Sequence, residues 1–187
     1  MVSDAKMGWN FWRVARWSIA AALLLTPAVM MQVSNEWNWG PASFVLAGIM
    51  ICGPILVYER TARLWPSVAY RGGAAVALVV SFLIIWINLA VGIVGEDNPI
   101  NFSFFMLIFA SAIGAFAARF QPDGMARAML GTAAVQMLLA IAIATAPSTQ
   151  REPGGAVSVL VLCGFFAGLW LVSAALFHKA SKATGEI

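Results

Sequence analysis

Six runs of mostly apolar residues, each about as long as a membrane span, constrain this chain more than any other feature. A bilayer core about 30 Å thick is crossed by about 20 apolar residues in a helix. Lipid offers no hydrogen bonds to the backbone, so such a run must be helical. The sequence therefore predicts an all-α polytopic transmembrane bundle, residues 1–187 forming a single integral membrane domain, with six helices at about 17–33, 41–58, 72–94, 99–118, 126–146 and 155–177.

Composition agrees with lipid as the main solvent. Of the 187 residues, 61% are hydrophobic and 10% are charged, whereas soluble domains have about 45–50% and 25%. The net charge of +3 is spread over the ends of the apolar runs and does not form the basic patch of a nucleic-acid-binding protein. The expected surroundings are a lipid bilayer, with no nucleic acid.

The positive charges predict an orientation. Polar segments on one side of the six helices hold ten of the eleven lysines and arginines, and the opposite side holds only Arg151. Lysine and arginine in short loops stay in the cytoplasm, so both termini of this multi-pass membrane protein are expected there. A five-helix topology would break this alternation. The first run could instead be a signal peptide, but no small-residue cleavage site follows it.

Three local sequence features add detail to the predicted helices. Asn98 followed by Pro99 is typical of a helix start, with a capping side chain and a proline in the first turn. Pro27 predicts a kink or tilt in the first span. Residues 7–16, rich in tryptophan and arginine, suggest an interfacial helix.

Polar side chains near the expected outer rim form the first candidate site. Glu96, Asp97, Asn98 and Asn101 lie in one short turn, and their oxygens suit a hard cation. The competing interpretation is a solvated turn, which we favour. Asn88 lies within the third run and forms either a hydrogen bond between helices or a polar vestibule joined to that turn.

Two further polar residues fall within or beside spans. Gln136 lies near the middle of the fifth run, where it is expected to hydrogen-bond another helix or to line a path. Glu59 ends the second run, four residues before Arg63, which is the favourable order for a helical ion pair. A role for Glu59 in carrying protons is the less economical alternative.

Small residues predict helix packing. Gly164 and Gly168 form a GxxxG motif in the sixth run, and Ala110 and Gly114 share that spacing in the fourth. Such faces let helices approach closely in lipid. The two faces are expected to pack within one bundle, with a homo-oligomer interface as the alternative.

Chemistry-bearing motifs are missing from the sequence. Cys52 and Cys163 are single thiols in apolar runs, and His178 is the only histidine. No nucleophile–base set, metal-ligand spacing or nucleotide-binding fingerprint occurs. We therefore expect no catalytic residues, no metal and no cofactor, and an enzyme ranks last among the function classes.

Three segments carry a resemblance: Trp37-Asn38-Trp39-Gly40-Pro41, Gly53 to Glu59, and Asn88 to Asn101. In these segments the chain resembles a family of small polytopic bacterial inner-membrane proteins with no known activity. The resemblance covers most of the chain and implies only a bacterial inner-membrane setting.

Two function classes stay open. In the first, the protein is an accessory or structural component that binds another membrane protein or lipid through its helix faces. In the second, it is a small transporter or channel, whose path runs from the outer acidic turn past Asn88 and Gln136. The second class predicts that Asn88 and Gln136 face one cavity.

Overall fold

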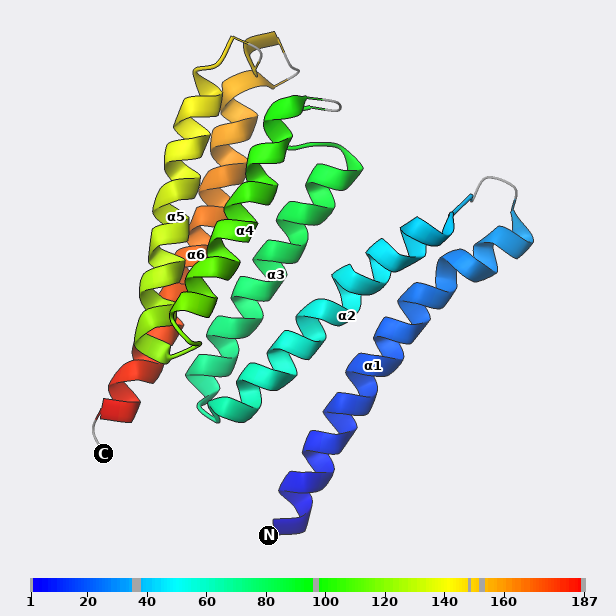
Figure 1. Ribbon diagram of the computed structural model, residues 1–187, viewed down its shortest axis with the longest axis vertical. Coiled ribbons are helices and arrows are strands. Elements are labelled where there is room, and N and C mark those ends of the chain that lie inside the picture. Colours follow the sequence, from blue (N-terminus) through cyan, green and yellow to red (C-terminus); the bar gives the residue numbers. More distant parts are fainter. Residues whose placement is uncertain (1, 35–37, 96–97, 148, 152–153, 186–187) are drawn as a thin grey trace. The chain divides into compact units, whose positions relative to one another are not determined.

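The computed structural model describes residues 2–34, 38–95, 98–147, 149–151 and 154–185. Within these ranges the chain is helical, with six α-helices and two short 3-10 turns. The helices are α1 (Val2–Val33), α2 (Pro41–Leu64), α3 (Val68–Ala90), α4 (Phe102–Ala117), α5 (Pro122–Ala144) and α6 (Gly155–Gly185) (Figure 1). The turns are η1 (Pro99–Asn101) and η2 (Thr149–Arg151). Six helices are long and apolar enough to cross a membrane, which confirms the predicted fold class and makes this a multi-pass membrane protein.

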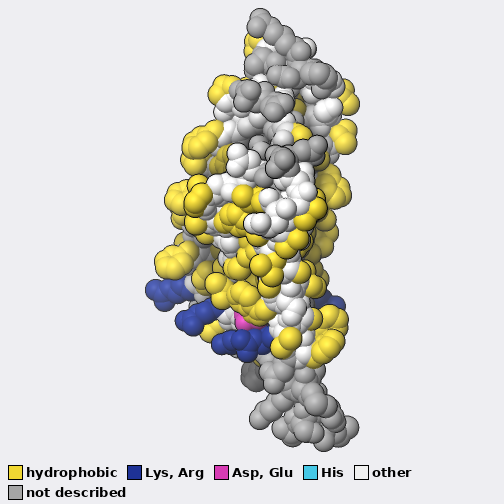
Figure 2. Space-filling view, turned by 90° about the vertical axis from the view of Figure 1, so that its right-hand side faces the viewer, with side chains coloured by type: hydrophobic (Ala, Val, Ile, Leu, Met, Phe, Trp, Pro, Cys, Tyr) yellow, Lys and Arg dark blue, Asp and Glu magenta, His cyan; other side chains and the backbone are white. Residues whose placement is uncertain are grey.

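The surface of the described chain is strongly apolar. Large hydrophobic side chains are exposed on all six helices. On the face seen in Figure 2, hydrophobic side chains cover most of the described surface. An exposed apolar surface of this extent is stable only against lipid or another protein.

The chain divides into two compact units, residues 1–57 and 58–187. The first unit holds α1 and most of α2. Helix α1 continues unbroken through Pro27, and residues 7–16 belong to the same helix rather than to a separate interfacial one. Thr26 donates its hydroxyl proton to the Ala22 carbonyl at 2.9 Å, which is how a hydroxyl is satisfied within a span.

The second unit is an up-and-down bundle of α3 to α6, preceded by the last turns of α2. Successive helices run in opposite directions (Figure 1). One end of this unit therefore carries Arg71 at the start of α3, Arg119 after α4, Arg127 early in α5, and Lys179 and Lys182 late in α6. The alternation of charge inferred from the sequence is thus reproduced in the order of these helices.

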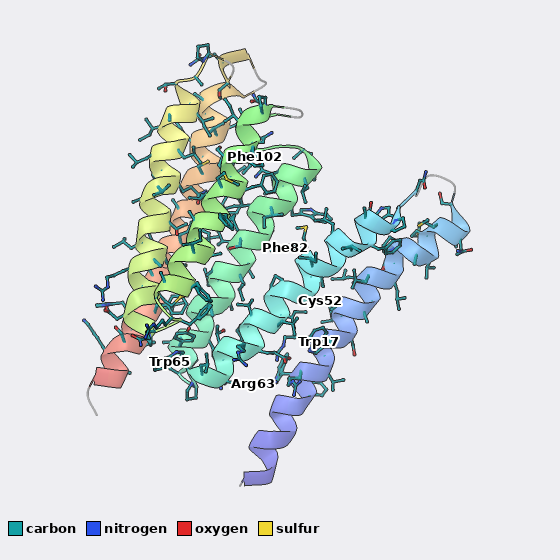
Figure 3. The ribbon with its side chains drawn as sticks, in the orientation of Figure 1. Trp17, Cys52, Arg63, Trp65, Phe82 and Phe102 are labelled. Atoms are coloured by element: carbon teal, nitrogen blue, oxygen red, sulfur yellow. The ribbon has the colours of Figure 1, made fainter. Side chains whose placement is uncertain are left out.

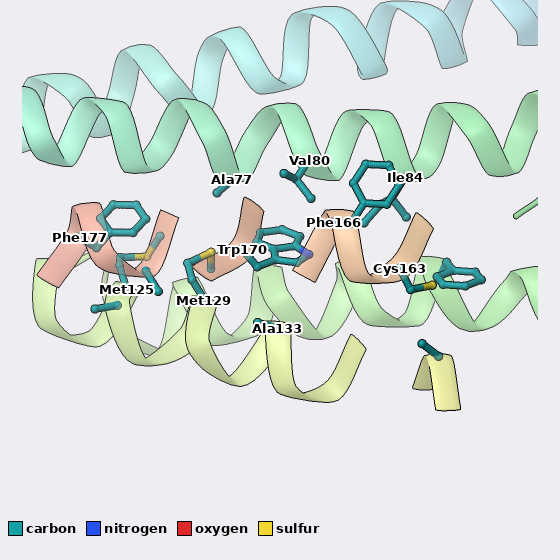
Figure 4. Close-up of a cluster of buried hydrophobic side chains, with 14 of the residues drawn as sticks. Ala77, Val80, Ile84, Met125, Met129, Ala133, Cys163, Phe166, Trp170 and Phe177 are labelled. Carbon is teal, nitrogen blue, oxygen red and sulfur yellow. The ribbon is translucent and has the colours of Figure 1, made fainter. Parts of the chain in front are cut away.

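The core of the second unit lies along α3, α5 and α6 (Figure 4). On α6 the buried side chains are spaced by four and three residues in turn, as in the series Val159, Cys163, Phe166, Trp170, Ser173, Phe177 and Ala180. Helix α5 presents Met129, Ala133, Gln136 and Ala140 at similar spacing. An average of 3.5 residues keeps one seam facing its neighbour, as in left-handed helix packing.

Close approach of α3 to α6 depends on Gly73. Its carbonyl oxygen accepts a 2.8 Å hydrogen bond from the buried Ser173 hydroxyl. A Cβ at Gly73 would lie 3.1–3.2 Å from three ring carbons of Phe177, closer than ordinary van der Waals contact. Because lipid gives helices no net hydrophobic reason to associate, such tight contacts and hydrogen bonds hold the pair together.

The third helix differs from its predicted range of 72–94. It starts earlier, at Val68, and ends at Ala90. Gly92 and Gly95 have φ of +69° and +123°, which turn the chain away from the helix. Ile93 and Val94 are nonetheless buried, at 7% and 3% exposed, so hydropathy could not distinguish this apolar loop from one more turn of helix.

Other helix ends also shift. Helix α5 begins at Pro122 rather than 126, with proline in its first turn and Asp123 beside it. Helix α6 continues past 177 to Gly185 and carries Lys182 in its last turn, where a cation is favourable. Asn98 confirms its predicted capping role, since its side-chain oxygen accepts a hydrogen bond from the Ile100 backbone N–H at 3.1 Å.

We expect Gly73→Ala to lower the free energy of unfolding in mixed micelles by about 1 kcal/mol, because the new methyl group pushes α3 away from Phe177. Gly72→Ala is the matched control: its Cβ would meet only Leu176, at 3.5 Å. The control should be neutral or slightly stabilising, since alanine favours helix. Equal effects of the two substitutions would refute the close-approach argument.

Candidate functional site

A fully buried polar contact joins α5 to α6. Trp170 donates its indole N–H to the Gln136 side-chain oxygen at 2.7 Å, and both residues are fully buried. The partners are 34 residues apart, yet the antiparallel α5–α6 hairpin brings their seam positions to the same depth. The structural interpretation of Gln136 is therefore the one that its contacts support: the amide links two helices.

The nitrogen of the Gln136 amide differs from the oxygen in its hydrogen bonding. Among the described residues, its Nε2 has no hydrogen-bond partner. Cys163 lies beside this amide, seven residues before Trp170 on the same face of α6. The contact falls outside hydrogen-bond geometry. An indole, an amide and a thiol make no nucleophile–base pair, so this cluster sets helix register rather than performing acid–base chemistry.

The Asn88 side chain bonds its own helix through its amide nitrogen. Its Nδ2 donates to the Ile84 carbonyl at 2.7 Å, four residues back on α3. Its Oδ1 is buried and accepts no hydrogen bond within the described chain. The predicted vestibule from Asn88 to Asn101 has no hydrogen bond to support it, because the two amides have separate partners.

Asn101 holds the loop between α3 and α4 in place through two hydrogen bonds. Its Oδ1 accepts from the Val94 backbone N–H at 3.0 Å, and its Nδ2 donates to the Gly95 carbonyl at 2.7 Å. A Cβ at Gly92 would lie 2.3 Å from this Nδ2, so only glycine fits there. Both ends of the Asn101 amide are used to hold the backbone, which accounts for its burial.

Of the other outer-turn candidates, Glu96 and Asp97 lie outside the described residues, and Asn98 caps η1. No group of three or more potential metal-ligating side chains occurs in the part of the chain that the structure describes. The proposed cation site at this turn therefore gains no support from the described residues.

Glu59 forms the ion pair that its spacing predicts. Its carboxylate lies 3.7 Å from the Arg63 guanidinium, one helical turn on. The Glu59 side chain is 6% exposed and that of Arg63 is 60% exposed. Figure 3 shows Arg63 near the junction of α2 and α3, close to Trp65. The favourable order of the two residues along the helix suits a structural ion pair.

The small-residue motifs do not all pack within the chain. Gly114 on α4 faces α5, where its Cβ would meet that of Ala128 at 3.4 Å. Ala110 is exposed. At Gly164 and Gly168 a Cβ would meet no atom of the described chain within 4 Å. The expected packing of the α6 motif against the α4 motif is therefore wrong for Gly164 and Gly168.

Tyr70 is the structural residue that sequence reasoning missed. Its hydroxyl donates to the Phe120 carbonyl at 2.7 Å, and its ring packs edge-on against Phe177 at 4.9 Å between centroids. Phe120 and its neighbour Arg119 have φ of +57° and +50°, a left-handed conformation that costs non-glycine residues about 1 kcal/mol or more. Tyr70 thus fixes the strained α4–α5 link. Its hydrogen-bond partner lies 50 residues away in the sequence, so no local pattern predicts the contact.

The chain matches no family model, no curated protein and no solved structure.

A double-mutant cycle tests the Gln136–Trp170 link. Trp170→Phe and Gln136→Leu should each reduce unfolding free energy, but the pair together should cost less than the sum, because the double variant leaves no buried amide unpaired. A coupling of about 0.6–1.7 kcal/mol is expected for a hydrogen bond between membrane helices. Strict additivity in micelle unfolding would show that the contact contributes nothing.

Proposed function

We propose that this chain is a non-catalytic accessory protein of the bacterial inner membrane, which acts by binding another membrane protein through an outward face of α6. The support begins with the polar side chains inside the spans. Gln136 bonds α6, Asn88 bonds its own helix, and Glu59 pairs with Arg63. These groups support packing, which leaves helix faces as the means of interaction.

The glycine face of α6, defined by Gly164 and Gly168, is the observation that carries the proposal. Each glycine in a helix interior costs about 1 kcal/mol relative to alanine. Within the described chain no close contact requires a glycine at either position, in contrast to Gly73. Two glycines one turn apart let a second helix approach closely in lipid, and exposed Val161 and Phe165 flank them with contact area.

Transport ranks second. A path through the bundle needs Asn88 and Gln136 to face a common space. Gln136 is fully buried against Trp170, and Asn88 turns its amide back to Ile84. Neither contact is one that a water-lined path needs, so we place transport behind partner binding.

We test the proposed partner with the whole protein, extracted from its own membranes into lipid nanodiscs and weighed by native mass spectrometry. A companion membrane protein at fixed stoichiometry is expected, and Gly164→Ile with Gly168→Ile should release at least nine-tenths of it, because two branched side chains block close approach. Gly131→Ile on α5 is the matched control, since a Cβ there also meets no atom within 4 Å.

Two outcomes contradict the proposal. A companion retained by the double isoleucine variant would move the interface away from the glycine face. A wild-type particle that contains no protein other than this chain would refute the accessory role. If that particle contains a second copy of this chain, and the variant loses it, the glycine face is assigned to self-association.

The proposed orientation, with both termini in the cytoplasm, rests on the positive-inside rule. It can be tested with single cysteines at Gln150, in η2 before α6, and Ala183, near the end of α6, both of which are exposed. Cys52 and Cys163 are first replaced by alanine. A membrane-impermeant maleimide added to intact cells should label position 150 and spare position 183. The reverse pattern would invert the topology, and labelling at both positions would refute a spanning α6.

A further inference from the structure

An open groove of about 490 Å³ lies between α5 and α6 at the end of the second unit that carries most of its cations. Helix α5 contributes Asp123, Ala126, Arg127 and Leu130, and α6 contributes Leu171, Ala174, Ala175 and His178. On each helix the lining spans eight residues, which is about two turns. The volume falls in the range of small-molecule sites, about 300–1,000 Å³.

The groove is amphipathic along its length. Arg127 and His178 lie towards the ends of their spans, with Asp123 beyond Arg127. Leu130 and Leu171, which are 54% and 48% exposed, lie deeper along the helices. One end is thus polar and cationic, and the other is apolar and faces lipid.

Cations outnumber acids around the polar end. Lys182 follows His178 by one helical turn on α6, and Lys182 is exposed. The one acid that lines the groove, Asp123, contacts a single nitrogen of Arg127 through one oxygen. A guanidinium has five N–H donors in a fixed fork. Most of the Arg127 donors therefore remain for another anion.

We propose that this α5–α6 groove binds an anionic phospholipid, with the phosphate held by Arg127 and His178 and the first acyl carbons lying over Leu130, Leu171 and Ala175. Charge complementarity selects an anionic headgroup, because basic residues at a membrane surface attract such lipids by about 1 kcal/mol each. Groove length selects a lipid over a helix. A partner helix about 10 Å across needs contact over several turns, and this groove covers about two.

The lipid site uses residues other than the glycine face, and Leu171 follows Gly168 by about one turn on the same side of α6. The lining residues of the site do not include Gly164 or Gly168, so the charge variants below should leave a companion on the glycine face in place. Conversely, the isoleucine variants of that face should leave lipid retention unchanged. Failure of one proposal is therefore distinguishable from failure of the other.

The test uses the full chain in mild detergent, titrated with dioleoyl phosphatidylglycerol and weighed by native mass spectrometry, with dioleoyl phosphatidylcholine as a neutral lipid of identical chains. One phosphatidylglycerol per chain should be retained in preference to phosphatidylcholine. Arg127→Gln should weaken retention about fivefold, the loss expected for one surface charge. Asp123→Asn should strengthen it by a similar factor, because a competing carboxylate is removed.

Two further variants separate a built groove from diffuse attraction. Arg119→Gln removes an exposed cation at the same end of the unit without touching the groove, and it should leave retention unchanged. Ala175→Trp fills the groove and keeps every charge, and it should abolish selective retention. Equal losses in Arg119→Gln and Arg127→Gln, or full retention in Ala175→Trp, would overturn the proposal and leave only general surface attraction. Equal retention of the two lipids would overturn it as well.

Discussion

Lipid supplies no hydrogen bonds, and the arrangement of this protein follows from that constraint. Every span is a helix because a helix satisfies its own backbone. Polar side chains within the spans then bond either the helix backbone, as Asn88 does, or a neighbouring helix, as Gln136 and Ser173 do. Close packing must therefore hold the helices together. In the second unit, this packing is concentrated in the buried core along α3, α5 and α6.

Close packing in turn depends on a few small or precisely oriented residues. Gly73 lets α3 approach the Phe177 ring, and Tyr70 connects that same region to the strained link before α5. The opposite end of the unit depends on Asn101, which holds Val94 and Gly95 in place over the core. In both places one polar side chain fixes a backbone segment that has no regular structure to hold it.

Hydropathy, charge alternation and the Asn98–Pro99 cap were enough to predict six helices and the starts of several of them, because these signals are local. The end of α3 was not predictable in this way. Val91 to Val94 are as apolar as a span, and only the tertiary contacts of Asn101 with a glycine-bearing turn make them a loop. The packing partner of Gly114 and the open face at Gly164 and Gly168 were equally hidden. A small-residue motif specifies that something can come close, and not which helix does.

The hydrogen bond from Ser173 to Gly73 spans 100 residues of chain. During synthesis, α5 and α6 are consecutive helices that can pack together as soon as α6 enters the membrane. Helix α3 is different, because three further helices must be made before its partner α6 is complete. Until α6 is inserted, the Gly73 carbonyl lacks the hydrogen bond from Ser173. The packing of α3 in the second unit is therefore complete only once α6 has been inserted.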